Sequence, residues 1–262
     1  MIKRLQVKPR MRLAVMSFNL RYWEERDGAN AWPFRRDSVA QLILDNNPLL
    51  IGTQEGLRSM LGDLDQRLPN YSRIGEGRAH DGGNEFCAIY YQHHRLQVVR
   101  SEQFWLSEKP HLKGSKSWNS SLPRICTWAV FQDKQTKKQF AFFNTHLDHE
   151  SEWARLEGSR LILEVMESVR LTYPCILTGD FNCTPDREPI KLLSNRLVNI
   201  SATQDMGEVG TFHNFTGTAV NGPIDYIFCT DDVMIESGQV LNQKVNNRYP
   251  SDHFPVFARV RI

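Results

Sequence analysis

The chain has 262 residues, of which 40% are hydrophobic and 24% are charged, a composition typical of a soluble globular protein. The formal net charge of +2 is too small to indicate a polyanionic partner, although a local basic patch remains open. No segment approaches the ~18 consecutive apolar residues of a membrane span. The length suits one large layered domain, which we predict over residues 11–262 after a flexible arm of residues 1–10.

The cysteines and the N-terminal residues indicate in which cellular compartment the protein is found. The apolar run at 13–16 is too short for a signal peptide, and no small-residue cleavage site follows it. We therefore expect a cytoplasmic monomer without membrane association. The five cysteines are dispersed and lack C-x-x-C spacing, as is typical of small buried residues in a reducing compartment: Cys87, Cys126, Cys175, Cys183 and Cys229.

Hydrophobic periodicity predicts more strands than helices. Residues 12–20 form a predicted strand, and a polar, aromatic loop follows. The remaining predictions, in chain order, are a helix over 35–45, a strand over 48–55, a helix over 59–68, strands over 85–91, 96–106, 124–131 and 139–147, a long helix over 152–171, and strands over 175–181, 223–229 and 254–262. This mixed order suits packed sheets with helices outside.

The loop from Trp23 to Trp32 has two interpretations. Its tryptophans could stack on bases while Arg35 and Arg36 contact phosphates. Alternatively, it is a structural loop held by aromatic anchors, which we favour.

Polar residues stand at the ends of several apolar runs, where α/β folds place their sites. Each has an ordinary explanation by itself, such as a turn, a helix-start acid or a strand cap. Asp225 is harder to dismiss, because it lies inside an apolar run and a buried carboxylate needs a partner. The full set is Asn19, Glu55, His146, Asp180, Asn182, Asp225, Asp252 and His253.

Taken in order, the motifs FN, QE, NTH, GDFN, IDYIF and SDHFPV resemble the endonuclease/exonuclease/phosphatase superfamily over residues 13–262. The stretches FWLSEKP and NTHLDH resemble an uncharacterised bacterial branch. The resemblance implies an α/β fold: a four-layered α/β sandwich of two packed mixed β-sheets with outer helices, as in DNase I.

The resemblance also implies a role for each residue. Glu55, Asn19 and Asp252 would lie at a Mg²⁺ ion, for which Mn²⁺ could substitute. Asp180 would orient or deprotonate the attacking water, and Asn182 would face the phosphate. The phosphate would also meet Arg124, His253 oriented by Asp225, and His146 oriented by Glu85. Asp148 and His149 extend the NTH motif, and their role is open.

These assignments predict a Mg²⁺-dependent phosphoesterase in which water attacks in line. We favour a nuclease acting on phosphodiester bonds of nucleic acid, because the implied His146 and Glu85 pair resembles nuclease members. The alternative is a phosphodiesterase or phosphatase for a small-molecule or lipid phosphate. A non-catalytic binding module is the third hypothesis, and the complete set of matched residues argues against it.

Overall fold

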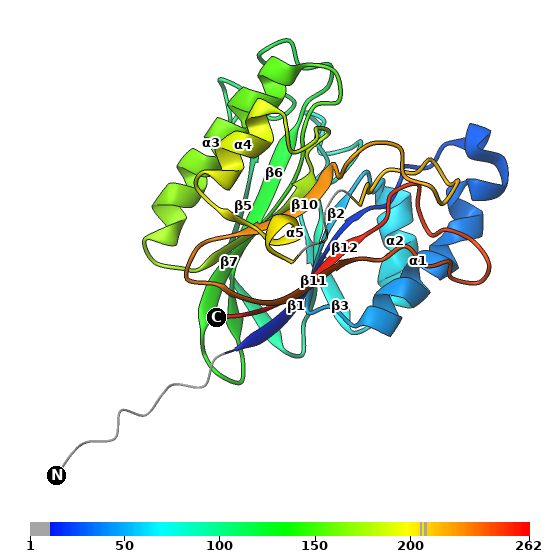
Figure 1. Ribbon diagram of the computed structural model, residues 1–262, viewed down its shortest axis with the longest axis horizontal. Helices are drawn as coiled ribbons and strands as arrows, with labels where there is room; N and C mark the ends of the chain where they lie inside the picture. The colour runs from blue at the N-terminus through cyan, green and yellow to red at the C-terminus, as the bar shows by residue number, and fades with distance from the viewer. Residues whose placement is uncertain (1–10, 205, 207–208) are drawn as a thin grey trace.

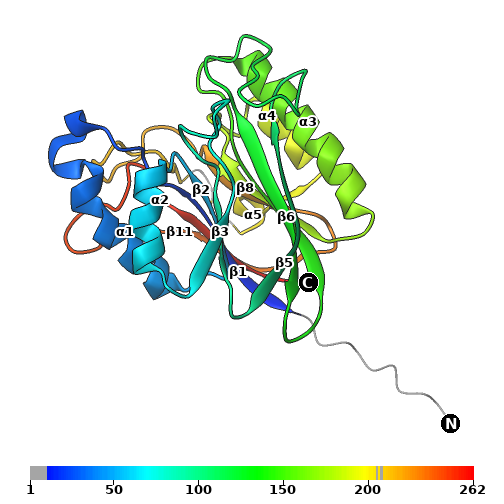
Figure 2. The ribbon, with the colours of Figure 1, turned by 180° about the vertical axis from the view of Figure 1, so that it is seen from behind.

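A computed structural model describes residues 11–204, 206 and 209–262. Two six-stranded mixed sheets face each other, and helices cover their outer faces (Figures 1 and 2). The fold is therefore the predicted α/β sandwich of two packed sheets. The arm predicted for residues 1–10 lies outside the described residues.

The first sheet has the strand order β11-β12-β1-β2-β4-β3, and α1 and α2 pack on its outer face. β1 runs parallel to β2, whereas its other neighbour β12 is antiparallel. The bounds are β1 Arg12–Asn19, α1 Trp32–Asn46, β2 Leu50–Gln54, α2 Arg58–Arg67, β3 Tyr71–Ile74, β4 Ile89–Gln92, β11 Met234–Val240 and β12 Val256–Arg261, with a short 3₁₀ helix η1 at Glu25–Asn30.

The second sheet has the order β5-β6-β7-β8-β10-β9 and also contains one parallel pair, β7 with β8. The helices α3 and α4 pack on its outer face. The bounds are β5 Leu96–Trp105, β6 Ile125–Asp133, β7 Gln139–His146, α3 Glu152–Arg170, β8 Cys175–Asp180, α4 Glu188–Ser194, β9 Val198–Asn199, α5 Ile200–Thr203 and β10 Asp225–Cys229.

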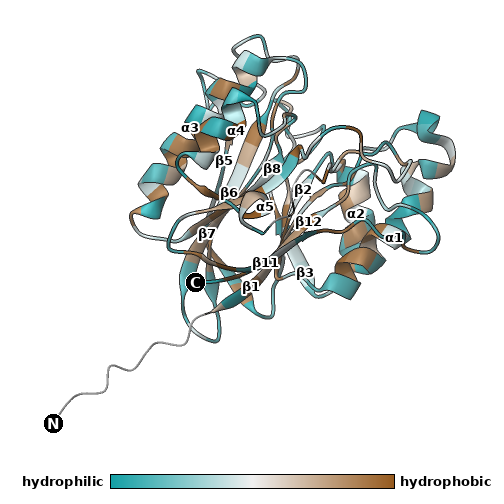
Figure 3. Cartoon of the chain, in the orientation of Figure 1, coloured by the Kyte–Doolittle hydropathy of each residue, from teal (hydrophilic) through white to brown (hydrophobic). Residues whose placement is uncertain are grey.

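Strand alternation divides the apolar residues into separate cores. In β1, Leu13 and Val15 enter the core between the two sheets, whereas Met16 and Phe18 pack beneath α1 and α2. A third core lies between the second sheet and α3 and α4. Accordingly, the outer helices carry both hydrophobic and hydrophilic colours in Figure 3. Several of the polar residues predicted for the site end buried strands or follow them directly.

Helix boundaries follow local signals that explain the differences from prediction. α1 begins at Trp32, before the predicted start, because Pro33 is favourable in a first turn. Asn47 ends it with a left-handed backbone. Ser151 caps α3 by accepting a hydrogen bond from the Ala154 N–H. Within the described residues, no helix is both long and apolar enough to cross a membrane.

Candidate active site

The polar strand ends meet at one edge because each sheet contributes a parallel pair. Strand register places Asn19 beside Gln54, which precedes Glu55, and places His146 beside Asp180. A pocket of about 480 Å³ lies at this edge of the sheets. Of the predicted residues, those lining it are Glu55, Glu85, Arg124, His146, Asp180, Asn182, Asp252 and His253.

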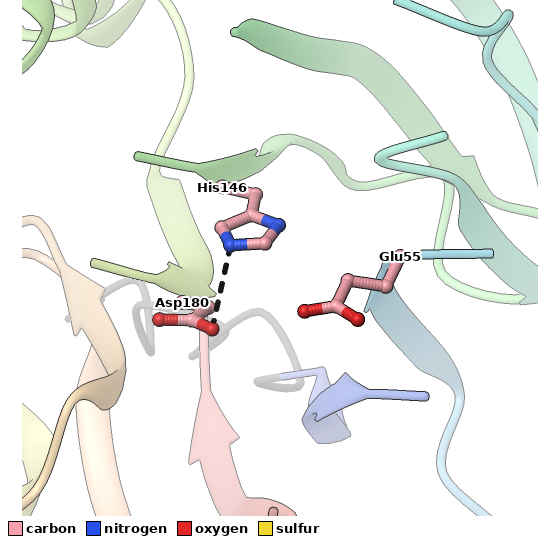
Figure 4. Close-up of side chains that lie close together, drawn as sticks. All are labelled: Glu55, His146 and Asp180. Atoms are coloured by element: carbon pink, nitrogen blue, oxygen red, sulfur yellow. Dashed lines mark ion pairs between the residues drawn. The ribbon is translucent and has the colours of Figure 1, made fainter. Parts of the chain in front are cut away.

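Glu55, which follows β2, points toward His146 and Asp180, the last residues of β7 and β8 (Figure 4). One ligand atom from each lies within 4.8 Å of the others. The Asn19 amide nitrogen bridges the two carboxylates, donating to Glu55 Oε1 at 3.0 Å and to Asp180 Oδ2 at 2.8 Å. Two carboxylates facing one space match the donor set that Mg²⁺ takes, with water and phosphate oxygens completing its shell.

Two of the three predicted metal residues lie differently from expectation. The side-chain oxygen Oδ1 of Asn19 accepts from the Arg21 backbone N–H, so the amide nitrogen faces the cluster and holds the carboxylates instead of offering a ligand oxygen. Asp252 lines the pocket, but its carboxylate lies 3.8 Å from Arg21 Nε and outside the Glu55, His146 and Asp180 cluster. Burial raises its pKa, opposed by His253 and Arg21. Glu55 is the predicted metal residue that fits best.

His253 and Asp225 form the predicted dyad. His253 Nδ1 donates to Asp225 Oδ2 at 2.8 Å, and both side chains are buried. Burial lowers the pKa of His253, but the charge and hydrogen bond of Asp225, together with Asp180, raise it well above the ordinary value. The ring is therefore an imidazolium whose Nε2–H, 3.9 Å from Asp180 Oδ2, is a cationic donor.

His146 has the opposite protonation state. Burial, together with the charges of Arg124 and Arg78, holds its pKa well below the ordinary value, so the 3.5 Å contact with Asp180 is not an ion pair. The Asn182 amide nitrogen donates to the Leu147 carbonyl at 3.0 Å and must also donate to His146 Nε2 at 3.0 Å. Asn182 was predicted to face the phosphate; one of its amide hydrogens is instead donated to His146 and the other to the Leu147 carbonyl.

The predicted pairing of His146 with Glu85 is wrong. The Glu85 carboxylate accepts from Arg78 Nη2 at 2.6 Å, because a buried carboxylate gains more from a guanidinium than from a neutral ring. Burial raises the pKa of Glu85, and Arg78 opposes that rise. Sequence analysis missed Arg78, which lies in a polar loop without any motif.

Arg124 lines the pocket as predicted, and its Nη1 is buried without a partner among the described residues. Arg35 and Arg36, which contact phosphates only in the less favoured interpretation of their loop, are engaged within the protein. Arg35 is fully buried and donates to the carbonyls of Leu20, Arg21 and Pro250, which ties two loops of the site together. Arg36 pairs with Asp63 on α2.

Of the two tryptophans that bound the loop from Trp23 to Trp32, one is the structural anchor that we favoured. Trp32, the first residue of α1, is buried and donates to Asp63, whereas Trp23 remains 41% exposed.

Three residues of the pocket have left-handed backbones: Arg21, Glu55 and Asn182, with φ of 53°, 62° and 50°. Such conformations cost free energy for residues with a side chain and concentrate at functional sites. At Glu55 the turn directs the carboxylate back over the strand end, where Oε2 accepts from the Tyr22 N–H at 2.9 Å.

Two sheets with outer helices, and a cluster of carboxylates, histidines and amides at their common edge, define an α/β sandwich with a candidate metal-binding active site. The model of the Endonuclease/Exonuclease/phosphatase family matches residues 16–253. The chain belongs to this family, whose members are hydrolases acting on phosphoester bonds.

Solved structures similar to this chain include two from Bacteroides thetaiotaomicron. A family protein is 34% identical with a TM-score of 0.91, over 97% of this chain and 99% of that one. A mannosyl-6-phosphatase is 34% identical with a TM-score of 0.89, over 95% and 99%. Nocturnin of Xenopus laevis is 30% identical over 128 residues, 47% of this chain. The chain spans only 30%, 50% and 43% of the first three curated relatives it matches.

Proposed function

We propose that this chain is a divalent-metal-dependent phosphatase that removes a terminal phosphate from a small molecule, with a phosphorylated sugar as the first candidate. The observation that carries the proposal is the pocket itself. A carboxylate pair and two cationic donors, Arg124 and His253, converge on about 480 Å³, within the size range of small-molecule sites. The mannosyl-6-phosphatase similar over nearly the whole chain supports the same substrate class.

Two observations weigh against the nuclease hypothesis. It was favoured for a pairing of His146 with Glu85, and Glu85 contacts Arg78 instead. A nucleic-acid substrate would also be expected to meet Arg35 and Arg36, and both are engaged elsewhere. Binding along a nucleic-acid backbone needs a track of available cations.

Each residue of the pocket has a definite task in this proposal. Mg²⁺ or Mn²⁺, when held by Glu55, would neutralise phosphate charge. The imidazolium of His253 and the free edge of Arg124 would donate to the non-bridging oxygens. Burial and the charge of Asp225 raise the pKa of Asp180, opposed by His253, so this carboxylate is suited to accept a proton from water.

A nuclease or other phosphodiesterase is the second candidate, because an aromatic surface borders the pocket. Tyr22 lines it beneath the Arg21 guanidinium, 4.5 Å from the ring centre, and the next residue, Trp23, is 41% exposed. Such rings could stack on a base next to the reacting phosphate.

Hydrolysis of matched substrates tests the proposal. We would compare p-nitrophenyl phosphate, bis-p-nitrophenyl phosphate, hexose 6-phosphates and single-stranded DNA and RNA, each with Mg²⁺, Mn²⁺ or chelator, and with Asp180→Asn as the inactive control. We expect the monoesters to have the highest kcat/KM, with a shallow dependence on salt. Faster cleavage of nucleic acid, weakening steeply with salt, would favour the second candidate.

A further inference from the structure

Asp148 and His149 follow the NTH motif after Leu147 and have no role in the chemistry described so far. His149 lines the pocket, and Asp148 precedes it in the chain. The Asp148 side chain is fully buried and accepts from the Ser121 N–H and Oγ at 3.1 and 2.7 Å and from the Ser151 N–H at 2.8 Å. It thereby joins the loop before β6 to the start of α3. Although burial opposes ionisation, these hydrogen bonds and Arg124 hold the pKa of Asp148 well below its usual range.

Both residues also contact Arg124. The Arg124 Nε lies 3.5 Å from Asp148 Oδ2, and Nη2 lies 2.9 Å from His149 Nδ1. A guanidinium can only donate, so His149 Nδ1 accepts, and the ring proton is on Nε2. Two edges of the guanidinium are thus fixed by acceptors.

The remaining edge of the guanidinium has no such acceptor among the described residues. Arg124 Nη1 is buried, has no partner within the described part of the chain, and belongs to a residue that lines the pocket with Glu55 and His146. A buried donor without a partner costs free energy that a bound anion would recover. A guanidinium held on two edges also loses little conformational freedom when it binds that anion.

We propose that Asp148 and His149 are positioning residues that hold Arg124 with its free edge toward the substrate phosphate. The inference rests on the proposed phosphatase function and extends it, since it states which residues outside the metal cluster set phosphate affinity. It also gives a role to the last two residues of the sequence NTHLDH, which a single leucine separates from His146.

A purely structural role for Asp148 is the competing explanation, because this residue also anchors α3. His149 separates the two explanations: its side chain is 47% exposed, and removing it leaves every contact between Asp148 and α3 in place. Ser151→Ala is the matched structural control, since Ser151 caps α3 through the Ala154 N–H and has no contact with Arg124.

The experiment measures kcat and KM for p-nitrophenyl phosphate, the dissociation constant of inorganic phosphate, and the thermal midpoint. For His149→Ala we expect KM and the phosphate dissociation constant to rise roughly tenfold, with kcat and the midpoint nearly unchanged. His149→Asn, whose side-chain oxygen can replace Nδ1 as acceptor, should restore most of the affinity. Asp148→Asn should weaken phosphate binding as well as lower the midpoint, whereas Ser151→Ala should lower only the midpoint.

Combination with Arg124→Ala makes the test specific. If His149 acts through Arg124, then His149→Ala adds no further loss in the Arg124→Ala background. Additive losses, or phosphate affinity within twofold of wild type in His149→Ala, would overturn the inference. A wild-type protein that binds phosphate but hydrolyses no monoester would refute the proposed function alone, while a protein that does neither would refute both.

Discussion

At the scale of single residues, the site is a set of side chains whose protonation states are fixed by their neighbours. His253 is charged because Asp225 accepts from its Nδ1, whereas His146 is neutral because burial and two nearby arginines oppose a proton. The two histidines therefore perform different tasks. His253 supplies a cationic donor, and neutral His146 is held by Asn182 beside Asp180.

The dyad gives the first prediction. His253→Ala should lower kcat by on the order of 10²–10⁴, the usual contribution of a positioned proton-transfer or phosphate-binding group. Asp225→Asn should cost less, since the ring stays in place but loses the charge that keeps it protonated. Steady-state kinetics on the best monoester substrate measures both. An Asp225→Asn variant as active as wild type would show that the dyad does not contribute to catalysis.

Metal binding gives a second prediction. Glu55→Gln should raise the Mg²⁺ concentration for half-maximal activity by at least roughly tenfold, because a neutral amide is a poor ligand for a hard cation. Glu188→Gln, on the surface beside Lys191, is the matched control and should leave the Mg²⁺ curve unchanged. Isothermal titration with Mg²⁺ or Mn²⁺ checks the affinity without turnover. Equal metal affinity in wild type and Glu55→Gln would remove Glu55 from the metal site.

At the scale of elements, the hairpin between β6 and β7 is held by Asp133 at its turn. The buried carboxylate accepts from the Thr136 N–H and hydroxyl and from Arg95 Nε at 2.6 Å. Burial by itself would raise its pKa, but the hydrogen bonds from Arg95 and Thr136 outweigh burial and lower the pKa from 3.8 to about 2. The contribution of Asp133 to the free energy of unfolding therefore depends on pH.

The third prediction follows from the sign of this shift. A group whose pKa is lower in the folded state stabilises that state at pH values above the pKa that it has in the unfolded chain. For Asp133 this contribution disappears as pH falls from about 4 to about 2. At neutral pH it amounts to about 2 kcal/mol. Asp133→Asn should lose about this free energy of unfolding at pH 7 and little at pH 2, as measured by urea denaturation. The exposed pair of Asp231 with Arg170 is the control, and Asp231→Asn should change stability by less than about 0.5 kcal/mol.

Elements differ in how well their sequence predicts them. β1, β7 and β8 are largely apolar and end in polar residues, so both the strands and their site residues could be predicted. β11, MIESGQV, has no fully buried residue and gives no such pattern. The partner of Glu85 could not be predicted either, because Arg78 reaches it through a loop whose course depends on tertiary packing. The periodicity of apolar residues in the sequence indicates which positions are buried. Which side chains pair with one another depends on the assembled fold.

At the scale of the whole molecule, the site depends on how closely the two sheets approach beneath it. Asn144 of β7 crosses this interface: its amide nitrogen donates to the Thr53 and Ala88 carbonyls at 2.9 and 3.0 Å, and its oxygen accepts from Gln54 at 2.7 Å and Thr178 at 3.1 Å. Asn144 and Thr178 lie two residues before His146 and Asp180. The asparagine of the NTH motif therefore holds the sheets together, a role that its sequence position alone does not indicate.

Gly52 of β2 makes this approach possible and gives the last prediction. A Cβ at this position would lie 2.1 Å from Thr178 Oγ1 and 2.5 Å from Asn144 Oδ1, so Gly52→Ala must push the sheets apart or break the polar network. We expect a loss of about 3 kcal/mol in the free energy of unfolding, combining overpacking with unsatisfied buried groups. We also expect lower kcat, because Glu55 and Asp180 lie on the two sheets that separate.

The control for this prediction is a second glycine, in a helix that packs on the same sheet as Gly52. Gly62 lies in α2, where a Cβ would meet no atom within 4 Å, so Gly62→Ala should stabilise the protein by roughly 0.5–1 kcal/mol through helix propensity. Urea denaturation and kcat of both variants separate a general effect of added bulk from a specific effect at the interface. If Gly52→Ala kept wild-type stability, the close approach of the sheets could not be what fixes the distance between the two carboxylates. In that case the contact that Asn19 makes with both of them would have to hold the site together alone.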